Sequence, residues 1–488
     1  MLFNSLEFAL FFPVVTILFF LLPHRFRWML LLAASCFFYM FFKPVYILIL
    51  VFTIVIDYFA GIWIARQQDK KKRKVLLLLS IASNVGVLAV FKYYNFITIN
   101  LNDAFQAVHQ GSPIPLLHIL LPIGLSFHTF QAMSYTIEIY RGNQEPERHF
   151  GIYALYVMFY PQLVAGPIER PQNILHQFHE VKHFDYGNMR SGLLQIAWGL
   201  FKKVVIADRL ALFVNQVYGD PTGYTGLPLI MATVFFAFQI YCDFSGYSDI
   251  ALGTARCMGF NLMTNFNKPY TATGIGEFWQ KWHISLSTWF RDYVYIPLGG
   301  NRVSKFRWYV NILIVFVLSG IWHGANWTFV VWGLLHGLYL IGERLFSKPG
   351  RRQDRPMSLP ATLFRRLIVF ILVSFAWIFF RSDSLGGAFY VVRHLFVGIP
   401  GQVREIAANL HFARLRLLYL GQSLTELMIA AAVLSFLLII QWQQRNQSID
   451  QWLQTKPKMF RWSFYYGLPL SFICLSIFNN SEFIYFQF

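Results

Sequence analysis

Long apolar runs nearly free of charge constrain this chain more than any other feature of its sequence. They approach the roughly 20 residues that a helix needs to cross a bilayer, and they include Phe8–Leu22, Val45–Ile64, Val75–Val90 and Leu363–Phe380. Lipid offers the backbone no hydrogen-bond partner, and these runs lack the alternation of barrel strands. We therefore expect an all-α, polytopic membrane protein with about 10 to 13 membrane segments, some too short to cross fully.

The charge of the chain supports the same class. Only 13% of its 488 residues are charged, whereas soluble proteins have about 25%. The net charge of +18 would suggest nucleic acid in a soluble protein, but short basic loops of membrane proteins stay on the cytoplasmic side. The stretch Lys70–Lys74 is thus expected to be a cytoplasmic loop, where contact with anionic membrane lipid is a further option. No nucleic-acid partner is expected.

One membrane domain over residues 1–488 is the simplest architecture, because the sequence shows no repeat and no low-complexity tract. Residues 382–426 are more polar, with charged residues at roughly helical spacing that include Arg414 and Arg416. They are expected to form amphipathic helices on the extracytoplasmic surface. The four cysteines have no metal-binding spacing, so no metal is expected.

A short hairpin is the first candidate for chemistry. Its arms, Trp308–Ile321 and Trp327–Ile341, are too short to cross a bilayer that needs about 20 residues. Basic residues flank both outer ends, at Lys305, Arg307 and Arg344 and in the loop Lys348–Arg355. These features predict a re-entrant hairpin that enters and leaves on the cytoplasmic side.

The tip of this hairpin is Trp322-His323-Gly324-Ala325-Asn326, where Asn326 is suited to cap the second arm. His323 would then lie deep in the membrane on broken backbone, which is tolerated only inside protein or beside a watery cavity. An imidazole there could accept the proton of a hydroxyl group. The alternative is that His323 merely closes the turn.

Two more histidines lie near this region in the sequence. His336 follows His323 by 13 residues, about 220° around a helix, so it is expected to face away from His323 and to pack. His283 lies in the stretch Phe278–Tyr293, whose tryptophans are typical of a membrane interface. Trp282 belongs to the same stretch, and His283 could point inward as a partner to His323.

Polar and helix-breaking residues interrupt two other apolar runs. Asp243 lies in the run Tyr241–Asp249, and pairing with Lys203 or Arg209 is the structural alternative to lining a polar path. Pro161 lies in the run Phe159–Ile168, where it would break a helix beside a cavity.

Four ordered motifs resemble the membrane-bound O-acyltransferase family, in particular its members that acetylate exopolysaccharides such as alginate. They are FYPQLVAGPIER (159–170), QIYCDFSGYSD (239–249), FWQKWHISLSTWFRDYVYIPLGG (278–300) and WHGANWTFVVWGLLH (322–336). The resemblance implies that His323 is the catalytic histidine and that His283 supports the site. Trp322, Asn326, Trp282, Asp243 and Pro161 are further candidates for the lining of a substrate tunnel.

The resemblance also implies the reaction and its setting. In such an enzyme of the bacterial inner membrane, an acetyl group passes from cytoplasmic acetyl-CoA to an extracytoplasmic polysaccharide hydroxyl, with a serine-dependent acetyltransferase as expected partner. Peptidoglycan, teichoic acid and lysophospholipid are alternative acceptors. A transporter or flippase for lipid-linked sugars is the rival from another class, but no broken hairpin in the first half matches the one at His323.

Overall fold

The computed structural model describes residues 1–107, 114–117, 121–164, 166–346, 358–408, 411, 417–444, 447–477 and 483–484. All regular elements in these ranges are helices, which confirms the predicted all-α fold. The chain forms two compact units, one of Met1–Ile196 with Tyr247–Thr264 and one of Ala197–Gly246 with Asn265–Phe488. The single membrane domain expected from the sequence stays a prediction.

Seven helices in the described ranges are long and apolar enough to cross a membrane, which supports a polytopic membrane protein. They are Pro44–Arg66, Lys70–Ala107, Leu227–Cys257, Lys305–His323, Trp327–Phe346, Leu359–Arg381 and Leu424–Gln444. Other apolar stretches form shorter helices. Helix α6 (Leu125–Arg141), for example, begins directly after Gly124, which adopts a left-handed backbone with φ 75°.

The first unit contains the helices of the N-terminal part of the chain. They are α1 (Leu6–Leu21), α2 (His24–Met40), α3 (Ile47–Arg66), α4 (Lys70–Leu88), α5 (Tyr94–Ala107), α6 (Leu125–Arg141), α7 (Phe150–Met158), α8 (Tyr160–Leu163) and α9 (Pro171–Ile174). Most of α10 (Tyr186–Leu200) and the end of α12 (Leu227–Cys257) also belong to it.

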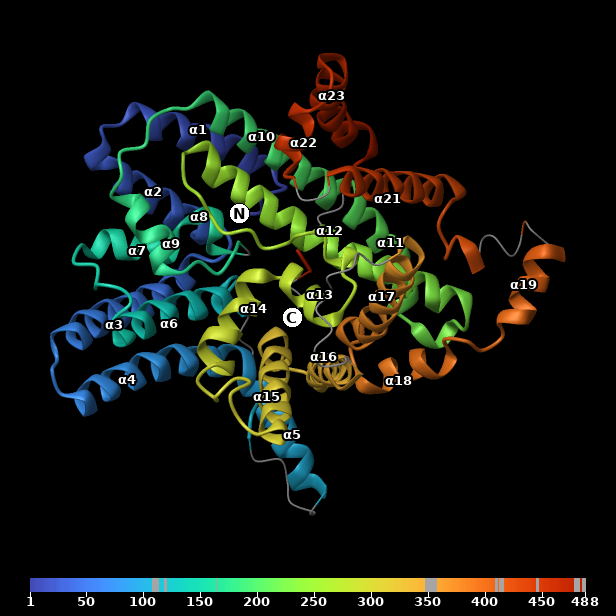
Figure 1. Ribbon diagram of the computed structural model, residues 1–488, viewed down its shortest axis with the longest axis horizontal. Helices are drawn as coiled ribbons and strands as arrows, with labels where there is room; N and C mark the ends of the chain where they lie inside the picture. The colour runs from blue at the N-terminus through green and yellow to red at the C-terminus, as the bar shows by residue number, and fades with distance from the viewer. Residues whose placement is uncertain are drawn as a thin grey trace. The chain divides into compact units, whose positions relative to one another are not determined.

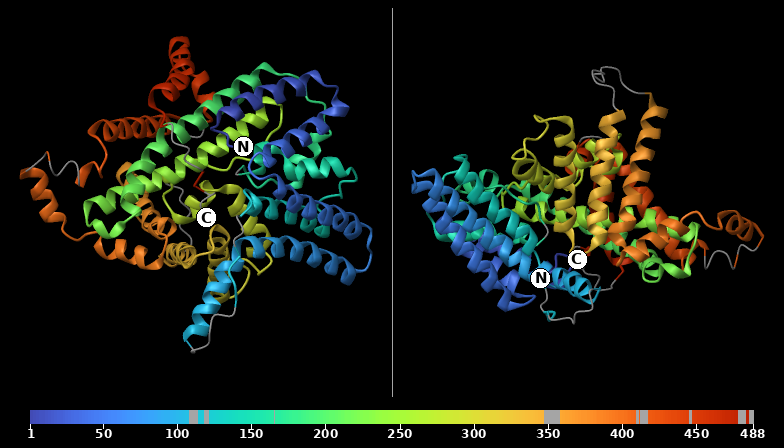
Figure 2. Two further views of the ribbon diagram at one scale, coloured as in Figure 1. Left: turned by 180° about the vertical axis from the view of Figure 1, so that it is seen from behind. Right: turned by 90° about the horizontal axis from the view of Figure 1, so that it is seen from below.

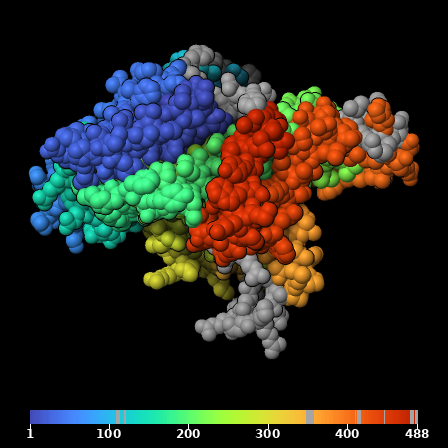
Figure 3. Space-filling view, turned by 90° about the horizontal axis from the view of Figure 1, so that it is seen from above, coloured from blue at the N-terminus to red at the C-terminus, as the bar shows by residue number. Residues whose placement is uncertain are grey.

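Helix α1 carries a row of apolar side chains that its own unit leaves exposed. Leu6, Leu10, Ile17 and Leu21 are each more than half exposed, and α1 lies at the surface in the space-filling view, in dark blue (Figure 3). An apolar face of this kind is stable against lipid tails, so it supports placement of this unit in the bilayer.

The basic stretch Lys70–Lys74, expected from the sequence as a loop, instead forms the first turn of α4. The side chain of Asp69 caps this helix by accepting a hydrogen bond of 2.8 Å from the backbone N–H of Lys71. An aspartate directly before the first helical residue is a strong start signal. The cytoplasmic position of these cations stays a prediction.

Helices α3, α4 and α6 pack side by side (Figure 1). They enclose a buried carboxylate. Asp57 is fully buried on α3. One of its oxygens accepts a hydrogen bond of 2.6 Å from the hydroxyl of Ser80, and the other accepts one of 2.8 Å from the amide of Asn84. The acid that the sequence places in a membrane span is thus held by hydroxyl and amide groups of the neighbouring helix α4.

The second unit contains the remaining helices. They are the end of α10, α11 (Asp208–Tyr218), most of α12, α13 (Ile275–Lys281), α14 (Ile284–Phe290), α15 (Lys305–His323), α16 (Trp327–Phe346), α17 (Leu359–Arg381), α18 (Leu385–His394), α19 (Ile399–Ala408), α21 (Leu424–Gln444), α22 (Ile449–Gln454) and α23 (Lys458–Leu475). Helices α15, α16 and α17 lie side by side, coloured from yellow to orange in the right-hand view of Figure 2.

Two glycines let α15 and α16 approach backbone to backbone. A Cβ atom on Gly320 of α15 would lie 2.2 Å from the carbonyl oxygen of Phe329, and one on Gly333 of α16 would lie 2.2 Å from that of Phe316. Such distances leave no room for any side chain, so small residues are required here, as at other helix contacts in membranes.

Some sequence predictions fall outside the described residues. These are the basic loop Lys348–Arg355 and the arginines Arg414 and Arg416. In the described part of residues 382–426, the helices α18 and α19 and the start of α21 are present. The extracytoplasmic position of this segment stays a prediction.

Candidate active site

His323 is the last residue of α15, and the helix stops because Gly324 adopts an extended backbone. Asn326 then caps α16, since its side-chain oxygen accepts a hydrogen bond of 3.0 Å from the backbone N–H of Thr328. Its amide also donates to the carbonyl oxygen of Asp383 at 2.9 Å. The broken tip and the capping role of Asn326 agree with the prediction from sequence.

The lengths of the two arms differ from the prediction. Helix α15 has 19 residues and α16 has 20, rather than the 14 or 15 expected, because the basic residues Lys305, Arg307 and Arg344 continue the helices instead of ending them. Each arm is long enough to cross a bilayer. The argument from length for a re-entrant hairpin is therefore wrong, and re-entrance itself stays a prediction.

His283 lies between α13 and α14 in a left-handed backbone conformation, with φ 44°. The start of α14 is held by Asn265, whose carbonyl oxygen accepts from the N–H of Ile284 at 2.9 Å. The side chain of Asn265 accepts from the backbone and the hydroxyl of Ser285 at 3.2 and 2.9 Å. These hydrogen bonds hold His283 at the break between helices α13 and α14. Sequence reasoning missed these hydrogen bonds, because Asn265 acts from 18 residues away.

The structure brings the two predicted histidines together. The ring centroids of His283 and His323 are 6.3 Å apart, and the side chains are buried, with exposed fractions of 0% and 3%. Aromatic rings surround the pair: Phe244 lies 4.6 Å from His283, and Trp322, Trp332 and Phe380 lie 4.9, 4.9 and 5.5 Å from His323. Burial lowers the pKa of His283 to about 3, so its imidazole is neutral near pH 7.

In the structure, the carboxylate of Asp243 takes part in an ion pair. Its carboxylate lies 2.6 Å from the Lys203 ammonium, which also lies 2.9 Å from Asp208. This agrees with the pairing weighed from sequence, whereas Arg209 pairs with Glu426 instead. The second oxygen of Asp243 accepts a hydrogen bond of 2.9 Å from the backbone N–H of Ile484.

The contact with Ile484 ties a late segment of the chain to the histidines. Phe483 is buried, with its ring 5.6 Å from that of Phe244, and Phe244 in turn packs on His283. Sequence reasoning missed this element, because an aromatic-rich stretch far from the motifs carries no signal of where it docks.

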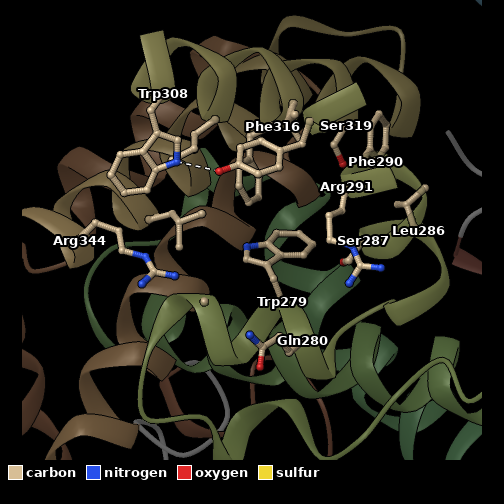
Figure 4. A pocket seen from close by; sticks show the side chains of 15 residues that line it. Trp279, Gln280, Leu286, Ser287, Phe290, Arg291, Trp308, Phe316, Ser319 and Arg344 are labelled. Atoms are coloured by element: carbon tan, nitrogen blue, oxygen red, sulfur yellow. Dashed lines mark hydrogen bonds between the residues drawn. The ribbon is translucent and has the colours of Figure 1, made fainter. Parts of the chain in front are cut away.

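A cavity of about 260 Å³ is lined by residues of the motif 278–300, which contains His283, and by residues of α15 and α16 outside the motif 322–336 (Figure 4). Ser287 and Ser319 both line this cavity. The backbone N–H of Ser287 donates to the carbonyl oxygen of His283 at 2.9 Å, and Ser319 lies one helical turn before His323. Its wall is mainly apolar and aromatic, with the indole of Trp279 between Arg291 on one side and Arg344 on the other (Figure 4). Both arginines are exposed, so the cavity combines an apolar interior with cations near solvent.

The remaining candidates for a tunnel lining do not contribute to this cavity. Trp282 is buried against other aromatic rings, the nearest being Phe266 and Trp377, both at 5.1 Å. Trp322 and Asn326 lie at the hairpin tip but are not among the residues that line the cavity. Pro161 is buried in α8 of the other compact unit. Their roles as tunnel residues stay predictions.

The expectation for His336 is wrong in its geometry. His323 and His336 both contact the ring of Trp332, at 4.9 and 5.0 Å between centroids. The helical-face argument counted residues along one continuous helix, but the helix breaks at Gly324, so the angle does not carry across. His336 therefore does not face away from His323.

Comparisons with known proteins identify the family. Residues 148–380 match the model of MBOAT, the membrane-bound O-acyltransferase family. The probable alginate O-acetylase AlgI of Pseudomonas aeruginosa is 37% identical over 460 residues, which cover 93% of this chain and 84% of that protein. This chain belongs to the membrane-bound O-acyltransferase family. His283 and His323 of this acyltransferase both lie in the matched region.

Other relatives in the MBOAT family carry names with different acceptors. The peptidoglycan O-acetyltransferase of Helicobacter pylori is 38% identical over 397 residues, which cover 76% of this chain and 74% of that protein. The teichoic acid D-alanyltransferase of Bacillus subtilis is 26% identical over 285 residues, which cover 56% of this chain and 72% of that protein. The chain is thus a membrane O-acyltransferase, and family membership favours this class over the alternative of a transporter.

Proposed function

We propose that this O-acyltransferase moves an acetyl group from acetyl-CoA on the cytoplasmic side of the bacterial inner membrane to an extracytoplasmic acceptor. The observation that carries the proposal is the pair of buried histidines, His283 and His323, whose ring centroids lie 6.3 Å apart. The cavity adds support, because Ser287 and Ser319, each four residues from one of the histidines, line it. The acceptor is a hydroxyl of a cell-envelope polysaccharide or of a serine-dependent acetyltransferase that passes the group on.

The cavity supports a coenzyme A thioester as donor. Its volume of about 260 Å³ lies below the roughly 300–1,000 Å³ of pockets for drug-sized ligands. It therefore encloses the acetyl group and part of the arm that carries it, while the nucleotide stays outside. Arg291 and Arg344 are exposed at this cavity, and arginine binds phosphate oxygens in a bidentate manner.

The chemistry assigned to the histidines is general base catalysis. His323 removes the proton from the acceptor hydroxyl, the oxygen attacks the thioester carbonyl, and the C–S bond breaks. The leaving thiolate takes the proton back from the imidazolium, which yields the free thiol of coenzyme A and an acetyl ester. His283, neutral because of its burial, orients His323 or the acceptor.

The direct test is turnover of labelled acetyl-CoA by the purified protein in detergent, with His323→Ala as the main variant. General base catalysis contributes typically about 10²- to 10⁴-fold, so the variant should lose activity by at least about 100-fold while its expression and melting temperature stay close to wild type. His176→Ala is the control, since that histidine is exposed outside the site. Wild-type turnover in the His323 variant would remove His323 from the mechanism.

A second test addresses whether the hairpin crosses the membrane. Cysteines at Arg307 and Arg344 should react with an impermeant thiol reagent only from the cytoplasmic face, once the four native cysteines are removed. A cysteine at Ala325 then separates two arrangements. Reaction from the outer face means that α15 and α16 cross fully, whereas no reaction from that face supports re-entrance. Reaction of positions 307 and 344 from opposite faces contradicts the hairpin in either form.

A further inference from the structure

Three aromatic residues separate the arginine-lined cavity from His323. Trp279 lines the cavity, its ring is 5.8 Å from that of Trp332, and Trp332 lies 4.9 Å from His323. His336 completes the group, with its ring 4.9 Å from Trp279 and 5.0 Å from Trp332. Trp279, Trp332 and His336, here called the indole–imidazole cluster, thus form a continuous path from the cavity to the predicted base.

The polar atoms of this cluster lack hydrogen-bond partners within the part of the chain that the structure describes. They are Nε1 of Trp279, Nε1 of Trp332 and both ring nitrogens of His336. All four atoms are buried, and the side chains of Trp332 and His336 have exposed fractions of 0%. Native proteins leave few buried polar atoms unpaired, and each such atom calls for an explanation. Four in one cluster point to a ligand that supplies the partners.

The aromatic side chains around His336 form no hydrogen bond with its ring nitrogens. The ring of Tyr339 lies 5.8 Å away, and its hydroxyl does not bond to the imidazole. Phe278, Phe316 and Trp377 lie 6.2 to 6.3 Å from it, and the indole N–H of Trp377 already donates to the hydroxyl of Tyr270 at 3.2 Å. A histidine kept only for packing could be replaced by phenylalanine without leaving polar atoms unpaired. Its presence here therefore indicates a binding role.

We propose that the indole–imidazole cluster binds the amide-bearing arm of the donor thioester and guides it from the cavity to His323. This proposal rests on the proposed function. Indole nitrogens only donate, whereas a neutral imidazole donates at one nitrogen and accepts at the other. The arm of coenzyme A carries amide carbonyls that accept and amide N–H groups that donate, so it matches both kinds of partner. His336 is thus a positioning residue for the donor, in place of the packing role expected from sequence.

The test compares two acetyl donors in steady-state kinetics, acetyl-CoA and ethyl thioacetate, which has the same thioester but no amide. His336→Phe keeps a ring and removes both nitrogens. It should raise KM for acetyl-CoA by about 10- to 100-fold, because this factor corresponds to the loss of about two hydrogen bonds. The value of kcat should change little. The constants for ethyl thioacetate should stay at wild-type values. His336→Gln, which donates and accepts, should recover most of the affinity.

The tryptophans provide matched variants that keep the packing. Trp279→Phe and Trp332→Phe should each raise KM for acetyl-CoA by about 3- to 10-fold. Trp377→Phe is the control, because its N–H bonds inside the protein. It should lower the melting temperature without changing the ratio of KM values for the two donors. These three variants decide the question if His336→Phe does not fold.

Contrary results are distinguishable from failure of the proposed function. If the wild-type protein does not use acetyl-CoA at all, the proposed function fails, and this inference fails with it, before any variant is compared. If the wild-type protein uses acetyl-CoA but the variants affect both donors equally, or neither, only the inference is overturned. Binding of coenzyme A itself, measured by calorimetry, should follow the same order as KM.

Discussion

Two groups of buried polar side chains in this protein differ in how their central groups are paired. Around Asp57, in the first unit, both carboxylate oxygens accept hydrogen bonds from neighbouring side chains on α4. In the indole–imidazole cluster of the second unit, no described residue pairs with the nitrogens of Trp279, Trp332 or His336. Each unpaired buried group costs about 1–3 kcal/mol. A site that carries this cost in the unliganded protein has been selected for something other than stability.

The difference teaches how to separate structural from functional polarity inside a membrane protein. Polar groups within lipid must find partners in protein or in a cavity. Where the protein supplies the partner, as Ser80 and Asn84 do for Asp57, the group holds helices together. Where it does not, as at His336, the group is available to a substrate. Variants of the first kind should change stability, and those of the second kind should change turnover.

The largest effect is expected at the histidine pair. His283→Asn keeps a residue that tolerates a left-handed backbone and should lower turnover of acetyl-CoA by roughly 10- to 1,000-fold, with a melting temperature close to wild type. Lys268→Asn is the control, because Lys268 also has a positive φ, of 48°. If the melting temperature falls together with the turnover, His283 has a structural role like that of Asp57.

The next effect concerns the scaffold that carries His323. Gly333→Ala inserts a methyl group where a Cβ would lie 2.2 Å from a backbone oxygen, so α15 and α16 must separate. Overpacking of this kind costs typically about 1–3 kcal/mol, and both stability and turnover should fall. Gly342→Ala on the same helix meets nothing within 4 Å and should behave as wild type. Equal behaviour of the two variants would contradict the close backbone contact.

A stability effect without loss of turnover is expected at Asp57. Asp57→Ala removes the carboxylate that accepts hydrogen bonds from Ser80 and Asn84, which should lower the free energy of unfolding by about 1–3 kcal/mol. Turnover per folded molecule should remain. Ser83→Ala on α4 serves as control, with an expected change within about 0.5 kcal/mol. A variant that folds well but has lost turnover would show that Asp57 belongs to the reaction path and would break the comparison.

The most gradual effect is a pH dependence from Glu169 in the first unit. Burial raises the pKa of this carboxyl to about 7, against opposing hydrogen bonds from Met263 and Asn173. Between pH 4.5 and 7 the folded state keeps a proton that the unfolded state has released, so stability falls as the pH rises through this range. The slope should be at most about 1.4 kcal/mol per pH unit. Thermal unfolding of Glu169→Gln at several pH values should show no such slope. If the slope stays unchanged, another group causes the pH dependence.

The sequence predicted those parts of the site that depend on local pattern. The broken helix at Gly324 and the cap at Asn326 follow from residue type, and the pairing of Lys203 with Asp243 was one of two options weighed. The resemblance to the family named His283 and His323, which the fold places 6.3 Å apart.

What the sequence could not predict depends on contacts between distant segments or on the exact ends of helices. Asn265 and Phe483 act on His283 from remote positions, and neither lies in a motif. The predicted direction of the His336 side chain is wrong, because the angle per residue of a helix does not carry across the break at Gly324. The apolar pattern predicts arms that are too short, because charged residues at their ends are typical of loops, although here they extend each helix.

The hydrogen bond from Ile484 to Asp243 has a consequence for the timing of biogenesis. Residues 483 and 484 leave the ribosome after α15 and α16 have been made, yet Phe483 packs on Phe244, the ring that contacts His283, and Ile484 bonds to the neighbouring Asp243. Nascent chains still in translation therefore hold this histidine only in part. The packing on His283 is therefore completed only after α15 and α16 have been made.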